Sequence, residues 1–297
     1  MIENHFTMNA VKVVSYVLLT LLAVCCVVPF IIIISASFST DSQLYLNGYK
    51  IYPQMFTLEA YRVTFQNSNQ LLKAYGVTIF TTVVGGALSI LITSMAAYPL
   101  SRPDYKWRRQ ISFFFYFTML FSGGAIPSYI LISQYLHLRN NILVLIIPAL
   151  VNVWNIFLLR TYFSEVSMSL IEAAKIDGAS EIYIYFNVVI PIAKTGIAIV
   201  LYTIVLAYWN SWYNCLMYMT NEKIINLQYF LYRTMSNIDE ILKNAQSGSA
   251  AQVDVSKLPS ETVRMAMCVI AAGPMVFAFM FFQKYFVKGI AVGSVKG

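Results

Sequence analysis

The sequence predicts an all-α integral membrane protein with six transmembrane helices. Three observations lead to this fold class: the composition, the spacing of the charged residues and one short basic connection. Charged residues make up 11% of the chain and hydrophobic residues 59%, with a mean hydropathy of +0.66, whereas ordinary soluble domains carry about a quarter charged residues. A water-soluble globule of 297 residues cannot bury this much apolar surface and keep a polar exterior. A lipid bilayer accommodates it.

Six stretches of the chain contain no Asp, Glu, Lys or Arg over 19 to 29 residues. About 18 such residues suffice to cross a bilayer as a helix. Each crossing segment must be helical because lipid offers no partner to a free backbone N–H or C=O group. Gly85-Gly86 and Gly123-Gly124, in the second and third stretches, are expected to allow close helix approach or a local bend. The predicted transmembrane helices lie near residues 13–36, 74–100, 111–135, 142–160, 195–219 and 265–284.

The connection between the second and third predicted helices indicates the orientation. Four of its nine residues from Ser101 to Arg109 are Lys or Arg, and short loops rich in these residues stay in the cytoplasm. Both termini are then expected in the cytoplasm. The connections 38–72, 136–141 and 221–262 are expected outside the cell, and the small, polar stretch from Asn244 to Ser260 in the last of them is typical of a mobile loop.

The charge and cysteine patterns exclude other classes of function. The net charge of +7 does not indicate nucleic-acid binding, because the basic residues lie between apolar runs and not on a basic face. The four cysteines lie inside apolar stretches without a C-x-x-C pair, and only two histidines are present, so no metal site is expected. Neither a nucleophile nor a pair of acids stands out at a membrane boundary, so no catalytic residue is predicted.

The cytoplasmic connection 161–193 carries the most informative pattern. Ser169 is followed three residues later by Glu172, which has the form of a capping box and predicts that a helix begins there. Gly178 suits a left-handed residue that ends this helix. The connection therefore begins with one short helix followed by a tight turn.

A second helix is expected directly after the turn. Ser180 can cap it, and it runs to Pro191, where the fifth span begins. The resulting hairpin is expected to expose Glu172 and Asp177 and to pack Ile171, Ala174 and Tyr185. By spacing alone, this pattern also fits a plain helical hairpin lying on the membrane surface.

The same residues are similar to the signature loop of a known family. Glu172-Ala173-Ala174, Asp177-Gly178-Ala179, Phe186 and Pro191 resemble the EAA signature of ABC importer permeases. Three further stretches are similar to the carbohydrate-uptake type 1 permeases, in particular to their oligosaccharide branch, which is related to the second maltodextrin permease subunit. They are Phe121-Ser122-Gly123-Gly124-Ala125-Ile126-Pro127, Trp209-Asn210-Ser211-Trp212 and the tail from Lys288-Gly289 to Val295-Lys296-Gly297. The resemblance covers essentially the whole chain.

This resemblance implies the type I ABC importer permease fold, with a cytoplasmic coupling helix between spans four and five that docks into the ATPase. The implied ATPase-coupling residues are Glu172, Ala173, Ala174, Asp177, Gly178 and Ala179. The expected division of the chain is a first transmembrane helix with an external loop (1–72), a permease core with five transmembrane helices (73–290) and a cytoplasmic tail (291–297).

The function implied is that of a permease subunit, not an enzyme, in an ATP-driven, binding-protein-dependent importer. It would move a sugar, foremost an oligosaccharide, across the cytoplasmic membrane of a bacterium. The implied partners are a second permease subunit, two cytosolic ATPase domains, an extracellular solute-binding protein that contacts the connection 221–262, the sugar, and membrane lipid. The chain has no G-x-x-x-x-G-K-S/T phosphate loop. ATP and Mg are therefore expected on the partner ATPase, and no cofactor in this subunit.

Polar and aromatic residues in spans four and five suit a neutral polyhydroxy solute. The candidate substrate-path residues are Asn152, Asn155, Trp209, Asn210, Trp212 and Tyr213. Helical spacing places the three aromatic side chains on one face, where rings can cover sugar faces while amides bond to hydroxyls. An aromatic belt at the outer membrane interface is the alternative for the aromatic residues. The two asparagines of span four either line the path or hydrogen-bond between helices.

Other transporter classes remain as alternatives. A permease for an amino acid or another small polar solute would fit the same hairpin. An ion-coupled secondary transporter is less well supported, because such carriers usually hold ionisable residues inside their spans and the six apolar runs contain no Asp, Glu, Lys or Arg. A membrane-embedded enzyme would need a catalytic cluster that the sequence does not display.

Overall fold

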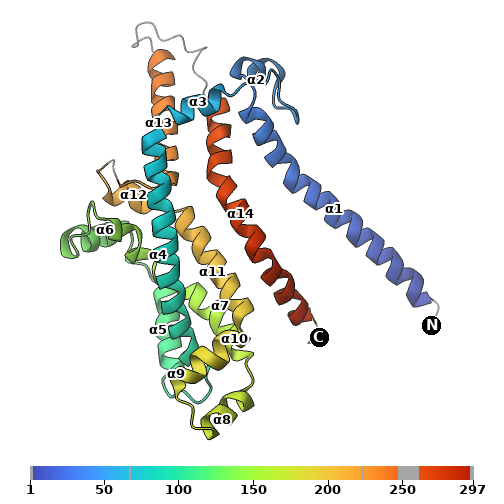
Figure 1. The fold of residues 1–297 in the computed structure, drawn as a ribbon, viewed down its shortest axis with the longest axis vertical. Helices are drawn as coiled ribbons and strands as arrows, with labels where there is room; N and C mark the ends of the chain where they lie inside the picture. Colours follow the sequence, from blue (N-terminus) through green and yellow to red (C-terminus); the bar gives the residue numbers. More distant parts are fainter. Residues whose placement is uncertain (1–2, 67, 222–223, 247–260, 295–297) are drawn as a thin grey trace. The chain divides into compact units, whose positions relative to one another are not determined.

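The computed structural model describes residues 3–66, 68–221, 224–246 and 261–294, and these residues form helices, turns and loops without a strand among them (Figure 1). The elements are α1 (Glu3–Ser37), α2 (Asp41–Asn47), α3 (Glu59–Phe65), α4 (Ser68–Ser101), α5 (Arg108–Leu120), α6 (Ala125–Ile130), η1 (Leu131–Tyr135), η2 (Ile142–Leu145), η3 (Ile147–Ala149), α7 (Val153–Ser164), α8 (Met168–Ile176), α9 (Glu181–Ile184), η4 (Tyr185–Val189), α10 (Ile190–Ile192), α11 (Lys194–Trp209), α12 (Tyr213–Tyr218), α13 (Leu227–Gln246) and α14 (Glu261–Ser294). Among these, η1 and η4 are π-helical turns, and η2 and η3 are 3₁₀ turns.

Three helices are long and apolar enough to cross a membrane. They are Lys12–Ser37 in α1, Asn69–Ser101 in α4 and Glu261–Phe286 in α14, and they contain the predicted spans one, two and six. Three apolar helix pairs are each broken by a bend, so the described residues provide up to 6 spans if each pair counts as one. The prediction of an all-α membrane protein is confirmed.

The third predicted span is a sharply bent pair. Arg108–Leu120 and Ala125–Tyr135 meet at an angle of 106°. The bend lies at Gly124, whose φ of 87° is a backbone conformation that glycine adopts without strain. Of the two roles expected for the glycine pair Gly123-Gly124, close helix approach and a local bend, the structure shows the bend.

The fourth predicted span is also broken. Ile142–Ala149 and Val153–Ser164 meet at 50°. The break precedes Asn152, whose side chain caps α7 by accepting a hydrogen bond from the backbone N–H of Asn155. A charge-free run conceals such a break, because a polar cap inside it leaves the charge count unchanged.

The fifth predicted span, 195–219, is wrong at its C-terminal end. Helix α11 ends at Trp209, and α12 restarts at Tyr213. The backbone between them is non-helical, with φ −131° and ψ −27° at Trp212. The Asn226 side chain donates a hydrogen bond to the carbonyl of Ser211 in this break, so protein replaces the helical partner that this carbonyl lacks.

The chain forms two compact units. Unit 1 comprises Met1–Ser68 and Arg233–Gly273, and unit 2 comprises Asn69–Tyr232 and Pro274–Gly297. The expected division at residues 72 and 290 stays a prediction.

Unit 1 gathers α1, α2 and α3 with parts of α13 and α14. The Thr262 backbone N–H donates to Asp41 Oδ1 over 2.8 Å, which joins α2 to the first turn of α14. Arg264 pairs with Glu261 at 2.9 Å and with Asp239 of α13. Helix α13 has 20 residues and lies in the first part of the connection 221–262, before most of the small, polar stretch 244–260 that predicts a mobile loop. The remainder of that connection, 222–223 and 247–260, lies outside the described residues.

A hydrophobic core in unit 2 receives residues from α4, α7, α8, α9, η4 and α11. Its buried members include Leu100, Leu159 and Val200 from the membrane helices and Ile171 and Ile184 from the connection between α7 and α11. Because the same core continues from the membrane helices into this connection, the two are packed together as one body.

Close approach in unit 2 depends on glycine. A Cβ atom added to Gly85 of α4 would lie 2.5 Å from the ring of Tyr208, and one added to Gly196 of α11 would lie 2.2 Å from the ring of Tyr162. The Tyr208 hydroxyl donates to the carbonyl of Ile146 over 2.9 Å and lies 3.3 Å from the Ser89 hydroxyl. The expected packing role of Gly85 is confirmed.

Candidate functional site

The candidate site is the helical hairpin formed by α8 and α9 in unit 2, which connects α7 to α11 (Figure 1). Helix α8 begins at Met168, with Ser167 as its N-cap and no side-chain cap hydrogen bond. The predicted capping box of Ser169 and Glu172 is therefore wrong. The helix begins one residue before Ser169, whose hydroxyl lies 2.7 Å from the Ser167 hydroxyl and does not cap the backbone.

The turn of the hairpin is a Schellman motif. Gly178 has a φ of 81°, and its N–H donates to the Lys175 carbonyl over 3.0 Å, while the N–H of Ala179 donates to the Ala174 carbonyl over 2.9 Å. These two bonds satisfy carbonyls that the end of a helix leaves unpaired. The predicted left-handed role of Gly178 is confirmed.

The second helix begins as predicted. The Ser180 side chain accepts a hydrogen bond from the backbone N–H of Tyr183 over 3.3 Å. The helical path continues through η4 and α10 to Ile192, where Glu181–Ile192 meets Lys194–Trp209 at 84°. The hairpin is thus joined to the membrane helix α11 by a bend at one residue, Ala193.

One side of the hairpin is anchored in the core of unit 2. Ile171 and Ile184 are buried. Tyr185 is also buried, and its hydroxyl lies 2.7 Å from the Ser94 hydroxyl of α4. Ala174 is partly buried against the same core, so the predicted packing residues are confirmed. Buried contacts to three membrane helices keep the hairpin from moving independently of them.

The opposite side of the hairpin is exposed. Glu172, Ala173, Asp177 and Gly178 are exposed, and Ile176 at the end of α8 is 87% exposed. The neighbouring apolar side chains Ile182, Tyr183 and Phe186 of the second helix are exposed as well. The six implied coupling residues therefore lie at or beside one exposed tip that combines two acids with apolar side chains.

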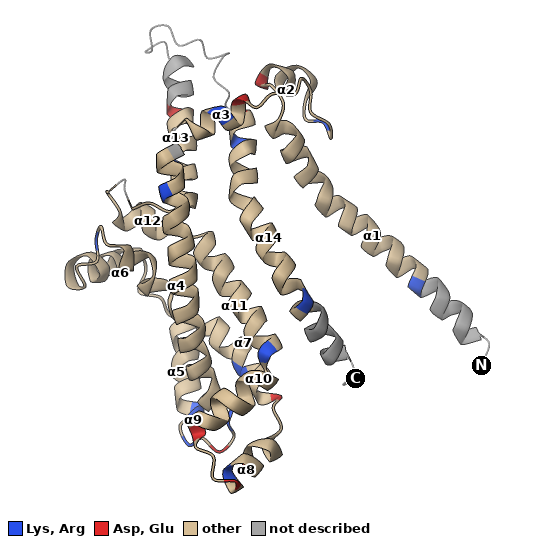
Figure 2. Cartoon of the chain, in the orientation of Figure 1, with Lys and Arg blue, Asp and Glu red and all other residues tan. Residues whose placement is uncertain are grey.

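An ionic network joins the hairpin to the end of α4. Arg102 donates two hydrogen bonds to Asp104, from Nε over 3.0 Å and from Nη2 over 2.9 Å. Lys175 of α8 lies 3.4 Å from Asp104 and 2.7 Å from Glu181 of α9. The Tyr98 hydroxyl of α4 donates to Glu181 over 2.7 Å. In the cartoon of Figure 2, the ribbon positions of Lys, Arg, Asp and Glu residues lie close together around α8 and α9.

The network shifts the titration of its members. The hydrogen bonds from Arg102 lower the pKa of Asp104 to about 2. The hydrogen bond that Lys175 donates to Glu181 raises the pKa of the lysine. Both shifts favour the charged forms, so Asp104 and Lys175 are charged at neutral pH. The network could not be predicted from the sequence, because Lys175 and Asp104 are 71 positions apart and no local pattern pairs them.

Known proteins resemble this chain over nearly its whole length. No protein-family model matches it. The polygalacturonan/rhamnogalacturonan transport system permease protein YtcP of Bacillus subtilis is 34% identical over 283 residues, which cover 95% of this chain and 96% of that protein. The chain belongs to the carbohydrate-uptake type 1 family of ABC transporter permeases.

Two further comparisons agree. Protein LplC of Bacillus subtilis is 35% identical over 91% of the permease and 90% of its own length. A chain in the crystal structure of a bacterial ABC transporter involved in the import of the acidic polysaccharide alginate superimposes with a TM-score of 0.76. That chain is 30% identical, and the match covers 94% of the permease and 97% of the other chain. The permease is thus a membrane-embedded subunit of an ABC importer and not an enzyme.

Two of the predicted substrate-path residues have structural partners. Asn155 of the permease is buried, and its Oδ1 accepts a hydrogen bond from the Thr203 hydroxyl of α11 over 3.2 Å. It joins α7 to α11. Asn152 is exposed and caps α7. The alternative of an interhelical hydrogen bond therefore describes Asn155.

The other predicted substrate-path residues lie around the break after α11. Trp209 is buried, with its ring centroid 6.3 Å from that of Tyr75 in α4. Asn210 and Tyr213 are exposed, as is Trp212, whose ring stacks on Tyr232 with centroids 5.0 Å apart. The prediction that the three aromatic side chains share one helical face is wrong, because the helix ends between the first and the second of them.

Among the described residues, no group of three His, Cys, Asp or Glu side chains could hold a metal ion.

Proposed function

We propose that this permease is one of two membrane subunits of a bacterial importer that moves an oligosaccharide across the cytoplasmic membrane. Two cytosolic ATPase domains, with ATP and Mg, supply the energy, and an extracellular binding protein delivers the sugar. The observation that carries the proposal is the exposed hairpin tip on a base packed into the membrane helices. Relatives named as sugar permeases support the substrate class.

The hairpin tip is the contact with the ATPase. It consists of Glu172, Ala173, Ala174, Asp177, Gly178 and Ala179, with Ile176 beside them. An apolar side chain that is 87% exposed, beside further exposed apolar residues, is typical of a surface covered by a partner. The buried base transmits movement of that partner to α4, α7 and α11, as rigid-body coupling requires.

The membrane topology we propose is six spans with both termini in the cytoplasm. The bent pairs 108–135 and 142–164 are the third and fourth spans, and α11 forms the fifth. The basic connection 101–109 faces the cytoplasm together with the hairpin. The contact expected between the connection 221–262 and the binding protein belongs to this proposal. Most of it falls on 247–260, which lie outside the described residues.

The substrate path passes the break between α11 and α12. Non-helical backbone at membrane depth is tolerated where it is buried in protein or lines a water-filled cavity. Asn210, Trp212 and Tyr213 are exposed at this break and combine an amide with aromatic rings, the chemistry that binds sugars. In this proposal Trp209 and Asn155 support the path from behind, and Asn152 contributes its exposed amide.

The test is transport by the assembled importer in vesicles. The tagged permease is co-purified with its partners and reconstituted, and ATP hydrolysis is measured with the binding protein and a panel of oligogalacturonides, neutral oligosaccharides and amino acids. Stimulation and uptake with an oligosaccharide are expected. Stimulation by an amino acid alone, or ATP hydrolysis by the permease without an ATPase partner, would contradict the proposal.

A further inference from the structure

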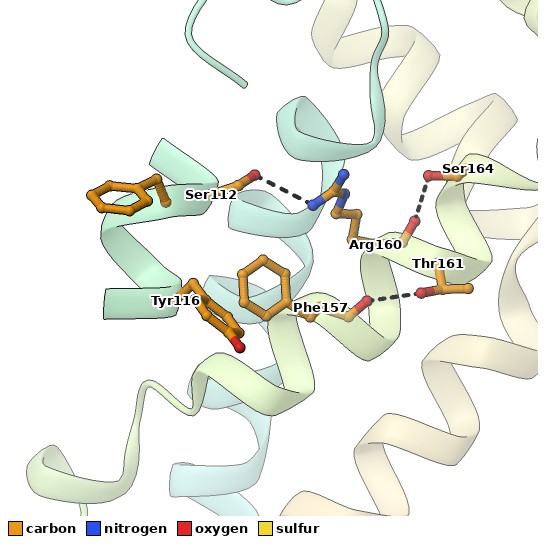
Figure 3. A pocket seen from close by; sticks show the side chains of 7 residues that line it. Ser112, Tyr116, Phe157, Arg160, Thr161 and Ser164 are labelled. Carbon is orange, nitrogen blue, oxygen red and sulfur yellow. Dashed lines mark hydrogen bonds between the residues drawn. The ribbon is translucent and has the colours of Figure 1, made fainter. Parts of the chain in front are cut away.

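A groove lies between α5 and α7 in unit 2, away from the hairpin tip and from the break after α11. Its volume is about 620 Å³, and its lining residues come from these two helices alone: Ser112, Phe113, Tyr116, Phe157, Arg160, Thr161 and Ser164. Figure 3 shows the Arg160 guanidinium directed toward Ser112, and the rings of Tyr116 and Phe157 that line the same groove. The lining thus combines one cation, four hydroxyl groups and three aromatic rings.

Arg160 brings an uncompensated positive charge into this groove. Its Nη1 donates to the Ser112 hydroxyl over 3.3 Å, and its guanidinium lies 6.0 Å from the Phe157 ring centroid. No acidic side chain lines the groove, and Arg160 makes no ion pair with the described residues. A partly buried guanidinium with unused N–H donors favours an anion that can accept several hydrogen bonds.

The polar and apolar parts of the groove lie at different depths. Helix α5 begins with Arg108, so Ser112 lies about 6 Å and Tyr116 about 12 Å along the helix from its start. Helix α7 ends at Ser164, which places Arg160 about 6 Å from the end and Phe157 deeper. A bilayer carries about 5–8 Å of headgroup region on each side of its hydrocarbon core. The cation therefore lies at headgroup level, and the deeper rings lie at the level of acyl chains.

We propose that this groove binds an anionic phospholipid, with its phosphate at Arg160 and Ser112 and the start of an acyl chain against Phe113, Tyr116 and Phe157. Basic pockets between transmembrane helices bind such headgroups in other membrane proteins. A free phosphate would use the guanidinium but not the rings. An anionic sugar would be expected at the break after α11 and not at headgroup level.

Photo-crosslinking tests the proposal. The complete importer is purified through a tag on this chain and incubated with phosphatidylglycerol that carries a diazirine in its acyl chain. Light is applied, and the labelled peptides are mapped by mass spectrometry. Label is expected on the peptides that contain Phe113 to Tyr116 and Phe157, and unlabelled phosphatidylglycerol should displace it while phosphatidylcholine should not.

Variants and competitors decide the outcome. Arg160→Gln should weaken competition by phosphatidylglycerol on the order of tenfold, as expected for the loss of one charge-assisted contact. Ser112→Ala should weaken it less. Arg139→Gln, which removes an exposed arginine from the connection 136–141, serves as the matched control and should leave it unchanged. Equal labelling of Arg160→Gln and wild type, displacement by inorganic phosphate or digalacturonate, or absence of label from both helices would overturn the proposal. If Arg160→Gln does not assemble, Ser112→Ala gives the same comparison.

Discussion

At the scale of single residues, Gly178 determines the direction in which the second helix of the hairpin leaves the turn. Its φ of 81° is strained for any residue with a Cβ atom, and no neighbouring atom would meet that Cβ within 4 Å. Gly178→Val should therefore cost at least ~1 kcal/mol through the backbone alone. Asparagine is similar in size to valine and tolerates the left-handed conformation better than valine does.

We therefore expect Gly178→Val to reduce binding-protein-stimulated ATP hydrolysis of the reconstituted importer more than Gly178→Asn does, with both inserted at wild-type levels. Equal defects in the two variants would show that the bulk at the tip matters and the backbone conformation does not.

Lys175 is the residue that ties α8 to both neighbouring carboxylates. Its side chain is 39% exposed, so solvent screens each of its two ion pairs and weakens it. Lys175→Gln should speed amide hydrogen exchange in α8 by about twofold to tenfold without affecting membrane insertion. Lys106→Gln is the control, because Lys106 is an exposed lysine of the connection 101–109 and its amine lies over the Trp107 ring at 5.7 Å, not against a carboxylate. Equal exchange rates in the two variants would contradict a stabilising role of the ionic network.

The pH dependence of this contribution follows from Asp104. The pKa of this carboxyl is lowered from 3.8 to about 2, so its stabilising effect is complete above the unfolded value and is lost as the pH falls through the folded one. The difference in stability between wild type and Asp104→Asn, followed by amide hydrogen exchange in α8, should therefore stay constant from about pH 5 to pH 8. A difference that disappears within this range would contradict the assigned ion pairs.

At the scale of the elements, α7 and α11 pack closely because Gly196 has no side chain. A Cβ atom there would lie 2.2 Å from Tyr162 Cγ and 2.5 Å from its Cβ, which are the least mobile atoms of that side chain. Gly196→Ala should therefore destabilise unit 2 by about 1–3 kcal/mol and lower the Tm of the detergent-purified importer. Gly86→Ala is the control, since its Cβ would lie 3.7 Å from Val205. Equal Tm values for the two variants would contradict this packing.

Elements with strong local signals could be predicted from the sequence. The hairpin follows from Gly178 and Ser180, and the three long spans follow from their charge-free runs. The breaks inside the other runs could not be located. They depend on a polar cap at Asn152 and on a hydrogen bond from the Asn226 side chain to the carbonyl of Ser211, 15 positions earlier in the chain. Helix α13 was not predicted, although the apolar residues of 227–241 recur at helical spacing along it. At the candidate site, the exposed tip was predicted, whereas the ionic network depends on contacts between segments far apart in sequence.

At the scale of the whole molecule, the proposed topology can be tested by labelling single cysteines in intact cells. The native cysteines Cys25, Cys26, Cys215 and Cys268 would first be replaced. Leu46→Cys in α2 and Lys106→Cys in the basic connection then introduce thiols at exposed positions. A membrane-impermeant maleimide should label the first in intact cells and the second only after the cells are opened. The reverse pattern would invert the orientation.

The central claim is that the hairpin tip holds the ATPase. Glu172 is exposed within α8 and does not cap the helix, so Glu172→Lys changes the charge of the contact surface without removing a cap. The hairpin variant combines Glu172→Lys with Gly178→Val. The control combines Glu59→Lys with Gly76→Val, because both of these residues are exposed and Gly76 has an ordinary helical φ. The membranes are solubilised, the tagged permease is captured, and the bound ATPase is measured. We predict that the hairpin variant loses the ATPase while the control retains it, with equal permease in the membrane. Normal ATPase recovery together with normal sugar uptake in the hairpin variant would contradict the account.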